Sequence, residues 1–308
     1  MAQQIDNVIL EIEKAVKGKR DIIVKVFAAI LAGGHILLED IPGVGKTTLA
    51  MAVARTLDMD YNRVQFTPDI LPSDIMGFSM YNQQSGKFEY REGSAFCNLF
   101  LADEINRTSP KSQSALLEIM EEKKVTVDSV TRELPTPFTV IATQNPIGSS
   151  GTQMLPESQL DRFMIRLSMG YPSHEAAILI LKGQEFVPMN SIARVITKDE
   201  LKELIDKTLR LPVHDSIYEY IVSLVEETRR SELFKMGASP RGANALLKMS
   251  RAMAVMEDRG YVAPEDIAKV FVDTLGHRVK LSSAAKAKGY NTDTALMEVL
   301  SFIKVPRT

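Results

Sequence analysis

The 308-residue sequence contains a single cysteine, Cys97, so no disulfide can form within the chain. This fits a reducing compartment, where structural disulfides are rare. The sequence also lacks an excess of charge of either sign, because 37 lysines and arginines face 39 aspartates and glutamates and the net charge is −2. The balance gives no overall attraction to nucleic acid or to an anionic membrane, although it is compatible with a local basic patch.

Long apolar runs are missing as well. The most apolar stretch, residues 22–38, is interrupted by Lys25, Gly33, Gly34 and His35, and it is too short and too broken to span a bilayer. The first twenty residues carry acidic side chains at an amphipathic spacing and do not have the basic and apolar segments of a signal peptide. These absences favour a soluble cytoplasmic protein.

The first half of the chain alternates predicted strands and helices. Apolar strands are expected at 35–39, 61–66, 98–102, 138–142 and 163–167, with helices at 46–57 and 109–122 between them. Such alternation is typical of a parallel sheet that is covered by helices on both faces. Two stretches, 77–90 and 123–134, break the alternation, and each is typical of a β-hairpin.

The strand signal fades after residue 172. Helical patterns follow at 173–182, 198–209, 213–231, 240–257 and 264–275, with a short helix at 292–303. A chain of this length has room for about two domains. We therefore predict an α/β core over residues 1–172 and an all-α domain over residues 173–308.

The segment LLEDIPGVGKTTLA, residues 37–50, has the pattern of a phosphate-binding loop. Gly43 and Gly45 make the turn between a strand and a helix, and the backbone N–H groups at the helix start can bind phosphate oxygens. Lys46 would reach the terminal phosphates, and the hydroxyl of Thr47 would bind Mg²⁺. The predicted nucleotide-binding residues are Pro42, Gly43, Val44, Gly45, Lys46, Thr47 and Thr48. A plain strand–turn–helix is the alternative.

Asp40 departs from this pattern, which has glycine at that position. Aspartate tolerates unusual backbone angles better than most residues. We therefore expect Asp40 to replace the glycine for geometric reasons, with its carboxylate directed away from the phosphates. On this interpretation, the substitution Asp40→Gly would be tolerated.

Nucleotide hydrolysis also needs acidic residues, and Asp103-Glu104 follows the apolar strand 98–102. Asp103 would act on Mg²⁺ through a bound water, and Glu104 would activate the attacking water as a general base. Exposed acids at the end of a strand are common by themselves, so the phosphate-binding loop is what favours the catalytic interpretation.

Two further polar residues are candidates for contacts to phosphate. Asn145 ends a strand and precedes Pro146, so its amide could reach the attacking water or the terminal phosphate; the alternative is an ordinary turn residue. Arg241 lies in the first turn of a helix that begins at Ser239, where a cation opposes the helix dipole. An anion such as phosphate would make this position favourable, and simple exposure to solvent is the alternative.

Together the segments LLEDIPGVGKTTLA, RVQFTPDILPSDIMG, ADEINRTSPKSQSALLEIMEE, VIATQNP, LPESQLDRFMIRL and GASPRGANALL resemble the MoxR family of AAA+ ATPases over nearly the whole chain. The resemblance implies a five-stranded αβα core with a C-terminal helical lid, binding ATP and Mg²⁺ between the subunits of a ring, expected to be a hexamer. It also implies that Asn145 is sensor 1, that Arg241 is sensor 2 and that Arg162 is an arginine finger. Asp40 fits the family, and the two hairpins match its helix-2 insert and pre-sensor-1 hairpin.

The resemblance further implies an ATP-driven chaperone that acts on protein partners, including proteins with von Willebrand factor type A domains. Two other functions stay open at this point: the motor subunit of a metal chelatase, and a motor that acts on DNA. Nucleic acid is the less expected partner, because core and lid use up the chain and leave no further DNA-binding domain. A nucleotide switch that barely hydrolyses ATP is disfavoured by Glu104. The sequence does not name the client.

Overall fold

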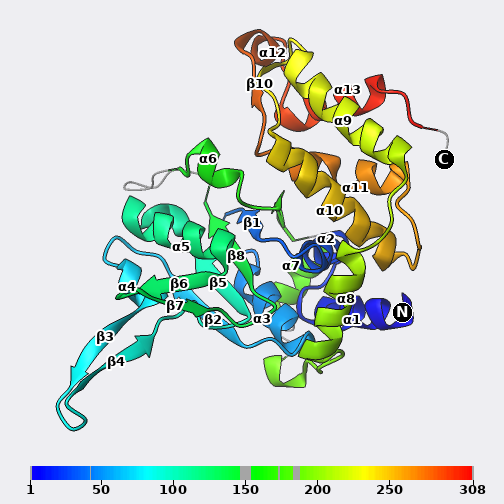
Figure 1. The fold of residues 1–308 in the computed structure, drawn as a ribbon. Coiled ribbons are helices and arrows are strands. Elements are labelled where there is room, and N and C mark those ends of the chain that lie inside the picture. The colour runs from blue at the N-terminus through cyan, green and yellow to red at the C-terminus, as the bar shows by residue number, and fades with distance from the viewer. Residues whose placement is uncertain (1, 42, 146–153, 173, 183–187, 307–308) are drawn as a thin grey trace.

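A computed structural model of the chain describes residues 2–41, 43–145, 154–172, 174–182 and 188–306 (Figure 1). Its centre is a sheet of five parallel strands in the order β2-β5-β8-β1-β9. These strands are β1 (Ile36–Glu39), β2 (Tyr61–Gln65), β5 (Leu99–Asp103), β8 (Thr139–Gln144) and β9 (Ile165–Leu167). The strands predicted from the sequence are all present, with ends that differ by one or two residues.

The sheet is buried on both faces because alternate residues of its strands belong to two different apolar clusters. In β1, Leu38 packs into one cluster and Leu37 into the other, and both are fully buried. The first cluster includes α1 (Ala2–Ala15), α2 (Arg20–Leu31) and α3 (Lys46–Thr56). The second includes α4 (Pro72–Met76) and α5 (Pro110–Glu122), and η1 (Ile105–Arg107) precedes α5. The predicted αβα core is confirmed.

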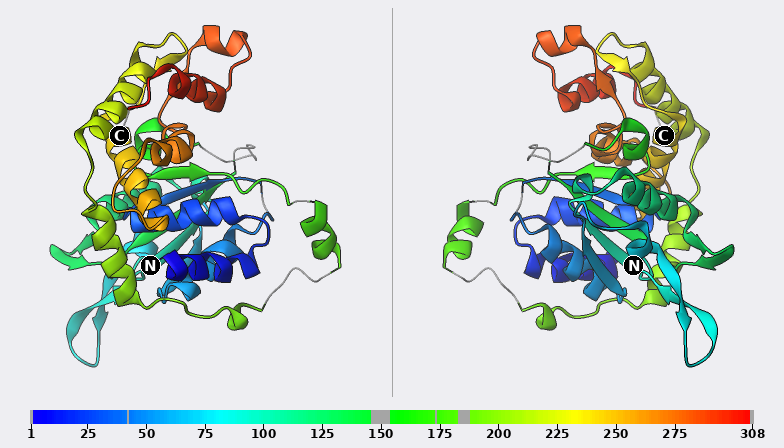
Figure 2. Two further views of the ribbon diagram at one scale, coloured as in Figure 1. Left: turned by 90° about the vertical axis from the view of Figure 1, so that its right-hand side faces the viewer. Right: turned by 90° about the vertical axis from the view of Figure 1, so that its left-hand side faces the viewer.

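Both predicted hairpins are present, as β3 (Gly77–Asn82) with β4 (Lys87–Glu92) and β6 (Lys124–Val127) with β7 (Val130–Glu133). Asp128 and Ser129 both have positive φ in the two-residue turn of the second hairpin, as a type I′ turn requires. The guanidinium of Arg132 lies 3.7 Å from the ring centroid of Tyr90, so the two hairpins contact each other. The first hairpin projects far from the core (Figures 1 and 2).

The C-terminal part is helical, as predicted, and also contains one short antiparallel ladder. The ladder pairs β10 (Phe234–Met236) with β11 (Lys280–Leu281). Helix α6 (Glu157–Leu160) precedes β9 of the core sheet, and the helices after β9 are α7 (His174–Leu181), η2 (Met189–Ser191), α8 (Lys198–Leu209), α9 (Asp215–Arg230), α10 (Pro240–Met256), α11 (Pro264–Leu275), α12 (Ser283–Ala287) and α13 (Thr292–Phe302). Figure 1 shows α9 to α13 as a group above the sheet. None of the helices in the described ranges is long and apolar enough to cross a bilayer.

The chain between the core and this helical group lies along the core. The backbone N–H of Val195 donates to Thr56 at 3.0 Å, and that of Ala193 donates to the Glu11 carboxylate at 2.9 Å. Helix α8 also packs on α2 (Figure 1). The predicted domain boundary at residue 172 stays a prediction, because these contacts tie residues after it to the core.

His35, just before β1, fixes the position of the central strands. Its ring accepts the backbone N–H of Val140 at Nδ1 at 2.9 Å, so the proton is on Nε2, which donates to the Met120 carbonyl at 2.8 Å. The ring therefore connects β8 and α5 from inside the protein. Burial lowers the pKa of His35 to about 4, because the charged imidazolium loses its hydration there.

This shift predicts a loss of stability in mild acid. Unfolded histidine has a pKa of about 6.5, so between about pH 6.5 and pH 4 the unfolded chain binds a proton at His35 that the folded chain does not. The free energy of unfolding should fall across this window by up to about 3 kcal/mol from this residue.

Urea unfolding of the wild type and of His35→Gln at several pH values measures this contribution. The difference between the two proteins should shrink as the pH falls, since the variant has no such titration. His277 is also buried with a lowered pKa, but it is present in both proteins and cancels. A difference that is constant from pH 7 to pH 4 would contradict the assignment.

Candidate functional site

The loop after β1 forms one wall of a cavity of about 450 Å³. Gly43 and Gly45 have φ values of 83° and 92°, a left-handed conformation that favours glycine, and α3 begins directly afterwards at Lys46. The predicted loop residues that line the cavity are Gly43, Val44, Gly45, Lys46, Thr47 and Thr48. Pro42 was also predicted and lies outside the described residues. The loop therefore presents the start of a helix to an open space, as anion binding requires.

Lys46 is half-buried at the base of this loop. Its ammonium donates to the backbone carbonyls of Asp40 at 2.8 Å and Ile41 at 3.2 Å. Burial lowers the pKa of Lys46 below its usual value, and the carboxylates of Asp40, Asp103 and Glu104 partly oppose this shift. A bound polyphosphate would favour the charged form of the ammonium further, so the residue is suited to an anionic ligand.

Asp40 has a different role from the one expected. Its carboxylate is directed away from the cavity, as predicted, but its φ is not positive, so the geometric explanation is wrong. One carboxylate oxygen accepts from the Ser168 hydroxyl at 3.0 Å, from the Gly170 N–H at 2.9 Å and from the Met169 N–H. The side chain is buried and ties the start of the phosphate-binding loop to the turn after β9. Glycine at position 40 would lose all of these bonds.

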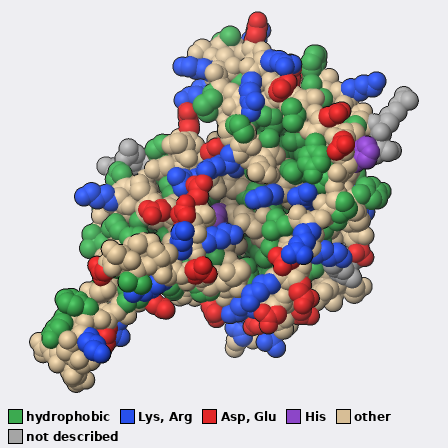
Figure 3. All heavy atoms as spheres, in the orientation of Figure 1, with side chains coloured by type: hydrophobic (Ala, Val, Ile, Leu, Met, Phe, Trp, Pro, Cys, Tyr) green, Lys and Arg blue, Asp and Glu red, His purple; other side chains and the backbone are tan. Residues whose placement is uncertain are grey.

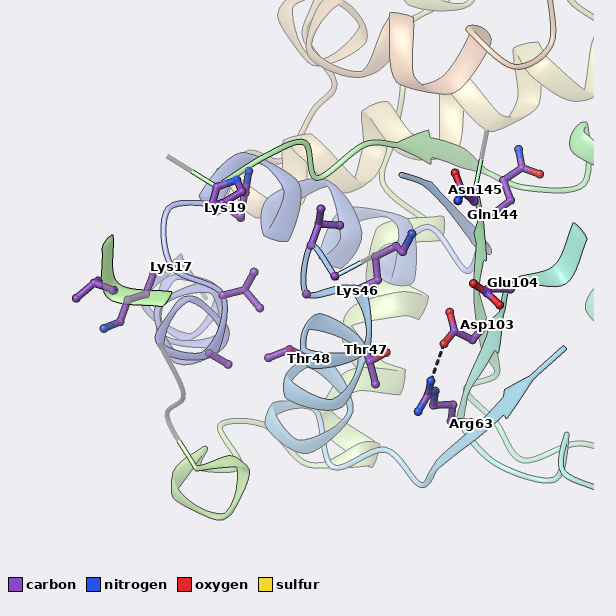
Figure 4. A pocket seen from close by; sticks show the side chains of 17 residues that line it. Lys17, Lys19, Lys46, Thr47, Thr48, Arg63, Asp103, Glu104, Gln144 and Asn145 are labelled. Carbon is purple, nitrogen blue, oxygen red and sulfur yellow. Dashed lines mark hydrogen bonds and ion pairs between the residues drawn. The ribbon is translucent and has the colours of Figure 1, made fainter. Parts of the chain in front are cut away.

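The predicted acidic pair lies across the cavity from Lys46, at the end of β5 (Figure 4). Asp103 accepts from the Arg63 guanidinium at 2.8 Å and from the Thr143 hydroxyl at 2.6 Å. In Figure 4 the side chains of Thr47 and Asp103 extend into the space between α3 and the sheet. A hydroxyl and a carboxylate facing a shared space are the oxygen ligands that Mg²⁺ takes in proteins.

Glu104 follows in a left-handed backbone conformation, with φ at 56°, which turns its side chain out of the strand. Its N–H donates to the Thr143 hydroxyl at 2.8 Å, and its carboxylate accepts from the Arg107 guanidinium at 2.7 Å. Thr143 thus holds both acidic residues in place from the neighbouring strand. Glu104 lines the cavity and can reach a water that attacks a bound phosphate.

Asn145 also lines the cavity, directly after β8. Its carbonyl accepts from the Asn106 side chain at 3.3 Å. Figure 4 shows Asn145 on the same side of the cavity as Glu104. The structure therefore brings together the phosphate-binding loop, both acids and Asn145, as the sequence predicted.

Sequence analysis missed several residues of this cavity. Arg63 and Thr143 contact the acidic pair from neighbouring strands, and only the strand order reveals their proximity. The end of the cavity farthest from the acids is lined by residues of the α1–α2 link and of the segment after β9, namely Ala15, Val16, Lys17, Lys19, Pro172 and Leu179. Gly18 in the sequence indicated a turn between the two helices, and in the structure its φ is 71°.

Arg162 and Arg241 do not line this cavity but lie together elsewhere. Each guanidinium is 2.5 Å from the carboxylate of Glu121 on α5. The three residues line a second, open cavity of about 500 Å³ between α5, the α6 segment and the start of α10. The anion that faces Arg241 within the chain is thus a carboxylate. No group of His, Cys, Asp and Glu side chains suited to a metal ion occurs among the described residues.

Comparison with known proteins gives consistent results along the chain. Residues 35–165 match the model of the ATPase family associated with various cellular activities, and residues 226–299 match an AAA lid domain. An uncharacterized Bacillus subtilis protein, YeaC, is 48% identical over 96% of this chain and 92% of its own length. Chaperone MoxR1 of Mycobacterium tuberculosis is 35% identical over 98% of this chain and 82% of its own length.

A solved structure supports the fold over its whole length. The crystal structure of a candidate ATPase from Cytophaga hutchinsonii is 38% identical and superposes with a TM-score of 0.91. The superposition covers 99% of this chain and 96% of that one. The α/β core and the C-terminal helical part therefore occur together in this related structure as well.

Substitutions on the two opposite walls of the cavity should have different effects. Lys46→Ala should abolish binding of ATP, because the phosphates lose the buried ammonium. Glu104→Gln should bind ATP with little change but hydrolyse it about 10²–10⁴-fold more slowly, since the general base is gone. Titration with a fluorescent ATP analogue and release of phosphate measure the two quantities. An equal loss of ATP affinity in both variants would contradict these assignments.

Asp40→Gly should destabilise the fold by roughly 2–4 kcal/mol, because buried donors in the turn 168–170 lose a charged acceptor. Asp40→Asn keeps the shape and one acceptor oxygen, so it should lose less and serves as the control. Denaturant unfolding of both variants measures the difference. If Asp40→Gly is as stable as the wild type, the bonds to Asp40 do not hold this turn.

Proposed function

This chain belongs to the MoxR family of AAA+ ATPases, and from that premise we propose that it hydrolyses ATP in a ring of identical subunits and uses the turnover to remodel protein partners. The observation that supports this most directly is the cavity in which Lys46 and the helix start face Asp103 and Glu104. A phosphate-binding wall and an acidic wall on opposite sides of one space are what hydrolysis of a bound nucleotide needs.

The two ends of the cavity differ in the residues that line them. Phosphates would bind at Lys46 and the N–H groups at the start of α3, and Thr47 with Asp103 would hold Mg²⁺. When bound, Mg²⁺ neutralises charge on the phosphate oxygens. The apolar side chains Val16, Pro172 and Leu179 at the other end offer a surface for the adenine ring.

Glu104 takes the proton of the attacking water in this proposal. Thr143 fixes the backbone of Glu104, and Arg107 holds its carboxylate, so the side chain has a defined position before the reaction. The amide of Asn145 lies close enough to the same space to orient the water or the terminal phosphate. Each group acts from the end of a strand, where the rigid sheet keeps its position.

The placement of Arg162 and Arg241 supports a ring. Both are half-exposed on one surface, and neither lines the chain's own nucleotide cavity. We infer that they reach the ATP of a neighbouring subunit, where they stabilise charge on the departing phosphate. A hexamer is the assembly proposed, as in the family.

Protein clients are the proposed partners that ATP turnover remodels. The relative MoxR1 carries the name chaperone, and proteins with von Willebrand factor type A domains are the partners we propose to test first. The projecting hairpin β3–β4 exposes apolar side chains to solvent, and its tip is visible at the lower left of Figure 3. These side chains are Phe78, Met80, Tyr81 and Phe88.

Stimulation of ATP hydrolysis distinguishes the proposed classes of partner. Hydrolysis should rise with subunit concentration and with a protein partner that is added to the ring. Strong stimulation by single- or double-stranded DNA would instead support a motor that acts on nucleic acid. Stimulation only by a metal-inserting partner complex would support the chelatase alternative.

Mixing of variants tests whether Arg162 acts on a neighbour. Arg162→Ala should bind ATP and hydrolyse it about 10³–10⁵-fold more slowly, and Glu104→Gln alone should also be slow. In mixed rings an Arg162→Ala subunit keeps Glu104 and receives Arg162 from its Glu104→Gln neighbour, so phosphate release should recover.

Exchange of subunits is verified with two fluorescent labels in the same samples. Exchange without recovery would exclude action between subunits, and full activity of Arg162→Ala alone would exclude the arginine-finger role.

A further inference from the structure

Arg278, just after α11, is a buried cation that the nucleotide site does not contact. Only 2% of its side chain is exposed. Desolvation lowers the pKa of its guanidinium to about 10, although Asp161 opposes the shift. A buried charge needs good partners, because one left unpaired is strongly destabilising.

The partners of Arg278 lie in the segment that carries Arg162. Its Nε donates to the Asp161 carboxylate at 2.7 Å, and Nη2 donates to the Asp161 carbonyl at 3.2 Å. Nη1 donates to the Met164 carbonyl at 3.2 Å. Further bonds reach the carbonyls of Phe163 and Thr274. The guanidinium therefore holds the backbone on both sides of Arg162 and binds it to α11.

The same aspartate also reaches the helix that carries Arg241. The second carboxylate oxygen of Asp161 accepts from the Ser239 hydroxyl at 2.9 Å. Ser239 is the N-cap of α10, since its oxygen accepts the Gly242 N–H at 3.2 Å. The carboxylate of Asp161, the residue before Arg162, thus connects Arg278 to the first turn of α10. In Figure 1, α6 lies to the left of α10 and below β10.

A second ion pair runs parallel to this one. Lys280 lies 2.5 Å from Glu157 at the start of α6. The pair is exposed and worth little by itself, but it connects the same two segments, 156–163 and 278–281. The segment with Arg162 is therefore bonded to the helical lid at two places, through Asp161 and through Glu157.

We propose that Arg278 is a positioning residue which, through Asp161, holds Arg162 and Arg241 as one rigid pair for a neighbouring subunit's ATP. This proposal rests on the proposed function, because it presumes that the two arginines act between subunits. Arg278 itself touches no nucleotide. The guanidinium of Arg278 bonds directly to the segment that carries Arg162 and, through Asp161 and Ser239, to the start of α10, so Arg162 and Arg241 move together with the lid.

Arg278→Lys tests this, since lysine keeps the charge but cannot make the same set of fixed bonds. The variant should bind ATP with an affinity within about twofold of the wild type, because its own cavity is intact. Its hydrolysis should be about 10²-fold slower, the typical effect of a displacement of about 1 Å in a reacting group.

Mixing distinguishes positioning from general damage. Arg278→Lys mixed with Glu104→Gln should recover activity, because the first variant has an intact cavity and the second has intact arginines. Arg278→Lys mixed with Arg162→Ala should not recover, because both lack a working arginine pair. Damage to the subunit's own site would prevent the first recovery and so overturn the proposal.

Arg259→Lys is the matched control. Arg259 also forms an ion pair with a buried aspartate of the lid, Asp266, but it lies away from Arg162 and Arg241. This variant should lose thermal stability while its activity at a permissive temperature stays near that of the wild type. An equal loss of activity in the two variants would overturn the special role of Arg278.

Asp161→Asn gives an independent answer if Arg278→Lys does not fold. It should show the same mixing behaviour, and wild-type activity in a folded Asp161→Asn or Arg278→Lys ring would overturn the proposal. The mixture of Arg162→Ala with Glu104→Gln is run in parallel. Its failure would refute action between subunits, whereas recovery there without recovery for the Arg278 or Asp161 variants would refute only the positioning role.

Discussion

The parallel pairing of β5, β8 and β1 is the constraint on which the site depends. Leu38 is in register with Thr143, and Ala102 with Ala142, so the three strands end at the same edge of the sheet. The phosphate-binding loop, the acidic pair and Asn145 each follow one of these ends. Burial on both faces fixes the register, because a shift by one residue would exchange the two apolar clusters. The same burial that stabilises the sheet therefore keeps these three strand ends, and the residues that follow them, at one edge.

The sequence was sufficient to predict those parts of the molecule that depend on local pattern. The loop between β1 and Lys46 and the acidic end of β5 at Asp103 could be read directly from the sequence. The Asp128-Ser129 turn identified a hairpin. Contacts between distant segments could not be read in this way. Arg63 reaches Asp103 only because β2 lies beside β5. Asp40 was misinterpreted for the same reason, since its partners lie about 130 residues later in the chain.

The lid and the core are connected by charged groups as well as by apolar packing. Lys25 on α2 pairs with Asp273 on α11 at 2.7 Å. Burial lowers the pKa of Lys25, but its acidic partners Asp273 and Asp21 together outweigh burial, so the pKa is raised. Arg278, just after α11, and Asp161 form a second connection. Directional contacts of this kind permit few relative orientations, so the lid occupies a defined position over the sheet edge.

Glu121 neutralises part of the positive charge of the exposed pair Arg162 and Arg241. One carboxylate faces two guanidinium groups, and Glu118 and Glu122 line the same open cavity, so its charged lining residues carry one net negative charge. Glu121 lies against both guanidinium groups and neutralises part of the repulsion between the two cations. Dissolved ions weaken all of these attractions over about 8–10 Å. In the ring proposed above, ionic strength would therefore change how readily one subunit recognises the next.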